Sequence, residues 1–259
     1  MTARHPKRLL GHRGACAERP ENTMASFERA AAIGVDVIET DVHVTRDGQV
    51  VIAHDPDGLR GAGVAETIAD STLEQVRAWD VGWGFRADDG TRPFADRGHR
   101  TPTLEEALEA FPDLRFNIDL KPDDPRVVAT VLSVVRRCRA AHRVCLASFH
   151  GRLIRAVRKA DFAGETVLAE AEVVAVLLTP SFWRRKLPFG GDALQLPPTS
   201  GVIDLSSERF IAKCHDMGYR VDYWTINDPD DAARLFDRGA DGVITDDPAA
   251  IKPVIDRYR

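Results

Sequence analysis

The sequence has few cysteines and lacks several familiar signatures, and each absence excludes a class of protein. The 259 residues contain only four cysteines, which are scattered and form no C-x-x-C pair. We therefore expect free thiols in a reducing compartment rather than a disulfide framework. No G-x-x-x-x-G-K-[ST], G-x-G-x-x-G or G-x-S-x-G motif is present, so these nucleotide-binding loops and the serine-hydrolase elbow are not indicated.

Long apolar runs and a strong positive charge are also missing. No stretch approaches the roughly 20 apolar residues of a membrane span, and no secretion-signal core follows residues 1–8. The formal net charge is −5, which argues against nucleic acid or an anionic membrane as the main partner. We expect a cytoplasmic protein that binds a small molecule, and the sequence does not indicate its oligomeric state.

Polar residues are instead concentrated between apolar runs in residues 9–57. Residues 8–11 are typical of a short buried strand that ends at a glycine. A helix start follows at residues 20–23, with Gly34 as its stop, and residues 35–44 are typical of a second strand. This order predicts a βαβ unit with parallel pairing.

Two carboxylates share one face of the second strand. Side chains alternate along a strand, so Glu39 and Asp41 point to the same side as Val37. At about 7 Å apart they repel one another unless a cation lies between them, and a hard divalent ion is the usual solution. The alternative is that both are solvated at a sheet edge, but apolar residues flank them on both sides.

A hairpin is predicted directly after this strand, because the Asp-Gly pair at 47–48 separates two β-rich runs. A two-residue loop places His54 across from Asp41, whereas a three-residue loop shifts that register by one. His54 and His12, which ends the first strand, are therefore candidates for chemistry. A surface position in a turn is the alternative for each.

The rest of the chain predicts further strand–helix pairs, about eight in all, which at this length favours one TIM (β/α)8 barrel spanning residues 1–259. The further strands are expected at residues 115–121, 144–149, 166–169, 193–196, 219–226 and 241–246, and helices at 102–108, 152–159, 207–217, 230–238 and 248–255. Residues 57–101 break the alternation and predict a small insertion. Its aromatic residues either shape a substrate cleft or form a small core.

Polar residues recur on one face of the strand predicted at 115–121. Asn117, Asp119 and Lys121 share that face, and the opposite face is apolar. Polar side chains at the inner, C-terminal end of a barrel strand are typical of an active site. Asp119 is therefore a candidate third carboxylate, and Lys121 a cation for phosphate.

Four motifs stand at defined spacing: His12-Arg13-Gly14, Pro20-Glu21-Asn22-Thr23, Glu39-x-Asp41 and His54-Asp55. Together they resemble the signature of the glycerophosphodiester phosphodiesterase family. The resemblance implies a TIM barrel with the insertion over its mouth, one divalent ion (Mg²⁺ or Ca²⁺) held by carboxylates, and His12 and His54 as the acid/base pair. It also implies that Trp224 packs on the glycerol part of the substrate, with a core position as the alternative. The third metal ligand of the family is often Glu, whereas here it is Asp119.

The resemblance implies hydrolysis of glycerophosphodiesters to sn-glycerol 3-phosphate and an alcohol, a reaction of lipid and glycerol metabolism. A metal on Glu39, Asp41 and Asp119, together with Arg13 and Lys121, would neutralise charge growing on the phosphate oxygens. The two histidines would exchange protons with nucleophile and leaving group near neutral pH. The nucleophile is either water or a neighbouring hydroxyl of the substrate.

Other functions stay open. A lysophospholipase D that acts on acylated substrates is supported only by residues 179–189, where aromatic residues beside three cations can contact a lipid tail or, weakly, a membrane surface. A solvated loop is the alternative for that stretch. An inactive barrel that only binds phosphodiesters is disfavoured, because the sequence keeps every residue expected for catalysis and metal binding. These residues are His12, His54, Glu39, Asp41 and Asp119. A metal-dependent sugar isomerase on the same fold would not need the anion site of Arg13 and Lys121.

Overall fold

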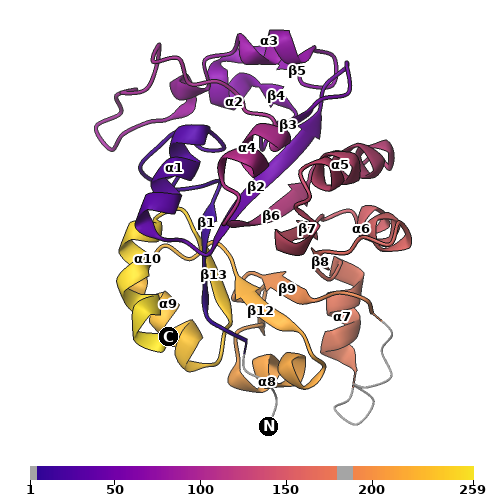
Figure 1. The fold of residues 1–259 in the computed structure, drawn as a ribbon. Coiled ribbons are helices and arrows are strands. Elements are labelled where there is room, and N and C mark those ends of the chain that lie inside the picture. Colours follow the sequence, from indigo (N-terminus) through magenta and orange to yellow (C-terminus); the bar gives the residue numbers. More distant parts are fainter. Residues whose placement is uncertain (1–4, 180–188) are drawn as a thin grey trace.

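The computed structural model of the chain describes residues 5–179 and 189–259 (Figure 1). In this part, eight parallel strands form the main sheet in the order β8-β7-β6-β2-β1-β13-β12-β9. The two ends of the sheet meet, because the amide of Leu168 donates to the carbonyl of Ala193 and the amide of Asp192 donates to that of Thr166, both at 2.8 Å. The sheet is a nearly closed barrel, and the predicted TIM-barrel fold is confirmed.

Strands and helices alternate along the chain, as predicted. The barrel strands are β1 (Arg8–His12), β2 (Val37–Val44), β6 (Arg115–Leu120), β7 (Val144–Ala147), β8 (Glu165–Thr166), β9 (Ala193–Leu196), β12 (Arg220–Tyr223) and β13 (Gly242–Thr245). The helices around them are α1 (Met24–Ile33), α4 (Leu104–Ala110), α5 (Arg126–Arg137), α6 (Gly151–Lys159), α7 (Glu170–Leu178), α8 (Glu208–Asp216), α9 (Pro229–Asp237) and α10 (Pro248–Ile255). Helices α5 and α7 are additions to the predicted set, and neither begins with a side-chain cap.

The helix predicted after the first strand has the expected ends. Thr23 is the N-cap of α1, and its side chain accepts a hydrogen bond from the amide of Ser26. Gly34 ends the helix in the left-handed conformation, at φ 88°, where its amide satisfies the last carbonyls. This short, capped helix returns the chain from β1 to the parallel neighbour β2.

The hairpin after β2 differs from the favoured prediction by one residue. Strand β3 (Val50–Ile52) pairs antiparallel with β2. The loop has three residues, 46–48, the last of which is a glycine at φ 80°. Asp41 therefore lies opposite Ala53, whose amide donates to the Asp41 carbonyl at 3.0 Å. The predicted pairing of Asp41 with His54 is wrong, because the left-handed glycine closes a longer loop.

Residues 57–101 form short elements that lie together at the top of Figure 1. They are β4 (Asp57–Gly58), α2 (Leu59–Ala62), β5 (Val64–Thr67), α3 (Leu73–Arg77) and the 3₁₀ helix η1 (Val81–Gly84). A small core of Ile68, Val76 and Trp79 packs on Val51 of β3. That core fixes these elements to the hairpin rather than to the main barrel core.

The side chains inside the barrel change in character from one end to the other. At the N-terminal end of the strands, Arg220 pairs with Asp222 at 3.0 Å and with Glu165 at 2.9 Å. Asn117 and Gln195 exchange hydrogen bonds of 3.2 and 3.0 Å between β6 and β9. An apolar cluster is contributed by Leu10, Val37 and Ile244. Polar groups therefore occur at more than one level, and only those at the C-terminal end of the strands adjoin the cavity described below.

The structure bears in two ways on membrane contact. Within the two described ranges, no helix is long and apolar enough to cross a membrane. The stretch at 179–189, for which weak surface contact is predicted, lies outside the described residues except at its two ends.

Gly14→Ala is expected to destabilise the fold by roughly 2–4 kcal/mol. Gly14 has φ 93°, and an added Cβ would lie 2.4 Å from the Ser26 hydroxyl oxygen. That hydroxyl holds the β1–α1 loop by hydrogen bonds to Ala15 and Arg13. Gly48, at φ 80° with nothing within 4 Å of an added Cβ, is the matched control, and Gly48→Ala should cost about 1 kcal/mol. Urea unfolding measures both, and equal losses would contradict the steric argument.

Candidate active site

A cavity of about 590 Å³ lies between the C-terminal ends of the barrel strands and residues 57–101. Its lining includes His12, Arg13 and His54, three of the predicted site residues. Trp79 and Phe85 line it from the insertion. Trp79 belongs to the small core and also borders the cavity, so the predicted small core is present, and the role of the aromatic residues in a substrate cleft stays a prediction.

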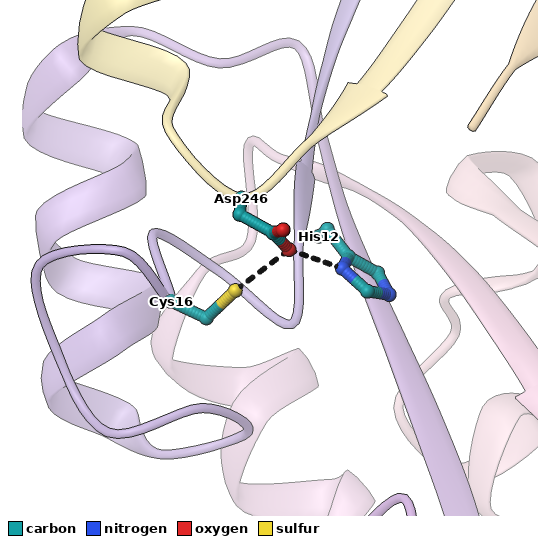
Figure 2. Close-up of side chains that lie close together, drawn as sticks. All are labelled: His12, Cys16 and Asp246. Atoms are coloured by element: carbon teal, nitrogen blue, oxygen red, sulfur yellow. Dashed lines mark hydrogen bonds and ion pairs between the residues drawn. The ribbon is translucent and has the colours of Figure 1, made fainter. Parts of the chain in front are cut away.

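His12 is held by a carboxylate from the other end of the chain (Figure 2). Its Nδ1 lies 2.5 Å from Oδ1 of Asp246, and its Nε2 lies 3.9 Å from Oε2 of Glu39. A carboxylate at Nδ1 favours the tautomer with the proton there, so the Nε2 lone pair faces Glu39. Burial alone would lower the pKa of His12, but the hydrogen bond with Asp246 and the charge of Glu39 raise it above its ordinary value.

Asp246 is a site residue that the sequence analysis does not identify. The next residue, Asp247, caps α10 by accepting from the amide of Ala250, whereas Asp246 points to His12. Its other oxygen accepts from Asn227 at 2.8 Å. Strands β1 and β13 are neighbours in the barrel, so closure brings this aspartate beside His12. The predicted closed barrel was the signal that could have revealed it.

His54 also has a carboxylate partner, since its Nδ1 lies 2.6 Å from Oδ1 of Asp55. Arg60 contacts that same aspartate at 2.5 Å and Glu21 at 2.6 Å. Glu21 in turn pairs with Arg13 at 3.0 Å. One network of ion pairs therefore links the insertion, the predicted phosphate-binding arginine and the second histidine.

Asp41 is almost fully buried, at 1% exposure, and is well compensated. The side-chain amide of Asn22 donates to the Asp41 carboxylate at 3.0 Å, and Arg13 Nε and Lys121 Nζ lie 3.4 and 2.9 Å from that carboxylate. Burial opposes ionisation, but the charges of Lys121 and Arg13 and the Asn22 hydrogen bond hold the pKa of Asp41 below its usual range. The Asn22 of the Pro-Glu-Asn-Thr motif thus serves to orient a buried carboxylate.

Glu39 and Asp119 are buried with less compensation. Burial and the charge of Asp41 raise the pKa of Glu39, and burial raises the pKa of Asp119. Lys121 contacts one oxygen of Asp119 at 2.8 Å. The other oxygen is buried and has no hydrogen-bond partner among the residues that the structure describes. A buried, unpartnered carboxylate oxygen suits a hard cation, so these residues fit the predicted metal ion.

Among the described residues, side chains that could bind a metal come closest together at two places other than the three predicted carboxylates. The ligand atoms of His12, Cys16 and Asp246 all lie within 4.8 Å of one another, as do those of a second group. That second group, on α4 and at the end of α5, consists of Glu105, Glu109 and Cys138. The predicted carboxylates are not such a group as they stand, and the ammonium of Lys121 lies between Asp41 and Asp119.

Neither Lys121 nor Trp224 belongs to the cavity lining, and Lys121 lies against the buried carboxylates Asp41 and Asp119. Trp224 packs against the apolar cluster inside the barrel and edge-on to Phe149, at 6.4 Å between ring centroids. Phe149, which the sequence analysis leaves without a role, is 68% exposed, and the ammonium of Lys121 lies 5.8 Å from its ring centroid. An aromatic wall with a nearby cation therefore follows the ends of β7 and β12.

Comparison with known proteins identifies the family. The model of the glycerophosphoryl diester phosphodiesterase family matches residues 12–250. A relative from Mycobacterium tuberculosis, named "Probable glycerophosphodiester phosphodiesterase 2", is 32% identical over 97% of this chain and 92% of its own length. A lysophospholipase D from Mus musculus is 27% identical over 97% of this chain and 87% of its own.

A solved structure shows the same fold. It is an Oleispira antarctica phosphodiesterase in complex with the product sn-glycerol-3-phosphate, at 24% identity and a TM-score of 0.76, and the match covers 97% of each chain. The resemblance drawn from the four motifs is confirmed, and so is the predicted class of enzyme. The chain belongs to the glycerophosphoryl diester phosphodiesterase family.

Proposed function

We propose that this chain hydrolyses glycerophosphodiesters to sn-glycerol 3-phosphate and an alcohol, with one divalent ion, Mg²⁺ or Ca²⁺. The observation that carries the proposal is a pair of histidines, each with a carboxylate at Nδ1, that line one cavity next to buried carboxylates. The structural neighbour from Oleispira antarctica holds sn-glycerol-3-phosphate, which supports a small-molecule substrate of this kind.

Glu39, Asp41 and Asp119 would hold the ion, which when bound supplies charge neutralisation at the phosphate. Arg13 presents a guanidinium suited to two phosphate oxygens, and it borders the cavity. Lys121 now neutralises Asp41 and Asp119. A bound cation would take over that task and free the ammonium for the phosphate.

Protons are handled by the two histidines. The Nε2 of His12 carries a lone pair in the tautomer that Asp246 favours, so it can accept a proton and later return it. His54, held by Asp55, takes the complementary part. The nucleophile is water or a neighbouring substrate hydroxyl, and either route uses the same two groups.

A lysophospholipase D activity is the second candidate. It is favoured by the name of the Mus musculus relative and by the exposed Phe149 beside Trp224, which suit an acyl chain at the rim. We also propose that the glycerophosphodiester phosphodiesterase acts in the cytoplasm, in lipid and glycerol metabolism.

Product release from a panel of glycerophosphodiesters and lysophospholipids tests the function. Chelation should abolish turnover because the buried carboxylates then lack their cation, and Mg²⁺ or Ca²⁺ should restore it. Glycerol 3-phosphate from deacylated substrates is the expected product. Turnover confined to acylated substrates would shift the assignment to lysophospholipase D, and turnover that survives chelation would contradict metal dependence.

His12→Ala and His54→Ala should each lower kcat by roughly 10²- to 10⁴-fold, because each removes one proton-transfer group. His142→Ala, at an exposed position before β7, is the control and should keep wild-type kinetics. Thermal unfolding establishes that all three variants fold. A folded His12 or His54 variant with near-wild-type kcat would disprove the assignment.

Asp246→Asn should lower kcat by roughly 10- to 10²-fold with little change in KM, because an amide no longer favours the Nδ1–H tautomer of His12. The adjacent Asp247→Asn keeps the cap of α10, because Asn caps a helix about as well as Asp, and should change neither kcat nor stability appreciably. Steady-state kinetics of the two variants separate the positioning of His12 by Asp246 from a general effect of an Asp-to-Asn change in this segment. If Asp246→Asn changed only KM or only the stability and left kcat at the wild-type value, the positioning role would be contradicted.

A further inference from the structure

Cys16 adds a third ligand type to the His12–Asp246 pair (Figure 2). Its Sγ donates to Oδ1 of Asp246 at 3.0 Å, the same oxygen that contacts His12 Nδ1 at 2.5 Å. The three residues come from the β1–α1 loop and the ends of β1 and β13, and all three border the cavity. One nitrogen, one sulfur and one oxygen thus converge at a place that small solutes can reach.

We propose that His12 Nδ1, Cys16 Sγ and Asp246 Oδ1 form a binding site for a thiophilic divalent ion such as Zn²⁺, distinct from the carboxylate site, and that its occupation switches off His12. Three protein ligands of these types with an open fourth position are typical of zinc. Ligands at normal zinc bond lengths lie roughly 3.3–3.5 Å apart in a tetrahedron. The observed separations of 2.5 and 3.0 Å would therefore open by less than about 1 Å.

The surrounding contacts suit such a site. Asn227 holds the second oxygen of Asp246, so the first oxygen stays directed at His12 and Cys16. The pKa of the Cys16 thiol is raised by burial and by Asp246, which makes it a poor nucleophile and leaves it outside the proposed reaction. The carboxylate site offers only oxygen and suits Mg²⁺ or Ca²⁺, whereas nitrogen and sulfur favour zinc or cobalt.

The blocking effect follows from the tautomer of His12. Binding forms metal–nitrogen, metal–sulfur and metal–oxygen bonds and releases the thiol proton to water. The imidazole gives up its Nδ1 proton and takes one from water at Nε2, so the ring stays neutral. Nε2 then carries a hydrogen and can no longer accept a proton from the nucleophile or the substrate.

Cobalt titration tests the site itself, independently of turnover, in the presence of saturating Mg²⁺. Co²⁺ bound to a thiolate shows a charge-transfer absorption in the near ultraviolet that oxygen ligands do not give. Wild type should show this band, and Cys16→Ser should lose it. Cys138→Ser is the matched control, because Cys138 belongs to the other convergent ligand group, with Glu105 and Glu109, and it should keep the band.

Zinc inhibition tests the consequence for His12, and so rests on the proposed function. Cys16→Ser should keep wild-type turnover without zinc and need at least about tenfold more Zn²⁺ for half inhibition, while Cys138→Ser should match wild type. A band that persists in Cys16→Ser or disappears in Cys138→Ser would overturn the site. A band lost in Cys16→Ser without any change in zinc sensitivity would overturn the blocking effect, even where the phosphodiesterase reaction itself is confirmed.

Discussion

Buried negative charge at the mouth of the barrel is the constraint on which the rest of the structure depends. Glu39, Asp41 and Asp119 are 7%, 1% and 6% exposed, and charges this deeply buried are costly unless they are paired. Arg13 and Lys121 lie against Asp41, and Lys121 also contacts Asp119. These cations compensate only part of the charge, which leaves Glu39 and one oxygen of Asp119 in need of another positive group.

The parallel barrel brings the two histidines that we propose as proton-transfer groups to this charge. Strands β1 and β2 are neighbours and present His12 beside Glu39 in register. The pairing of β1 with β13 brings Asp246 to the far side of the His12 ring. The β2–β3 hairpin carries His54 to the same cavity, and Arg60 and Glu21 connect its partner Asp55 to Arg13. The residues proposed to bind phosphate, to hold the metal and to transfer protons are therefore coupled through shared side chains.

Much of this arrangement could be predicted from the sequence, and the failures have physical causes. Because side chains alternate along a strand, Glu39 and Asp41 could be placed on one face of β2. Thr23 and Gly34 marked the two ends of α1. The hairpin register was wrong by one residue because Gly48 closes a three-residue loop, and local sequence does not separate the two loop types. Asp246 was not predicted as a site residue, because its position before a helix favours a structural role and its partner His12 is far away along the chain, so that only the closed barrel makes them neighbours. The roles of the predicted residues stay predictions.

Calorimetric titration of Mg²⁺ or Ca²⁺ into wild type and Asp119→Asn tests the central claim most directly. The amide keeps the size of Asp119 but removes the charge that Lys121 and the cation would share. The account predicts one ion per chain in wild type and affinity weakened by at least about tenfold in the variant. Equal affinity in the two proteins would show that the ion binds elsewhere, and would contradict the assignment of the buried carboxylates.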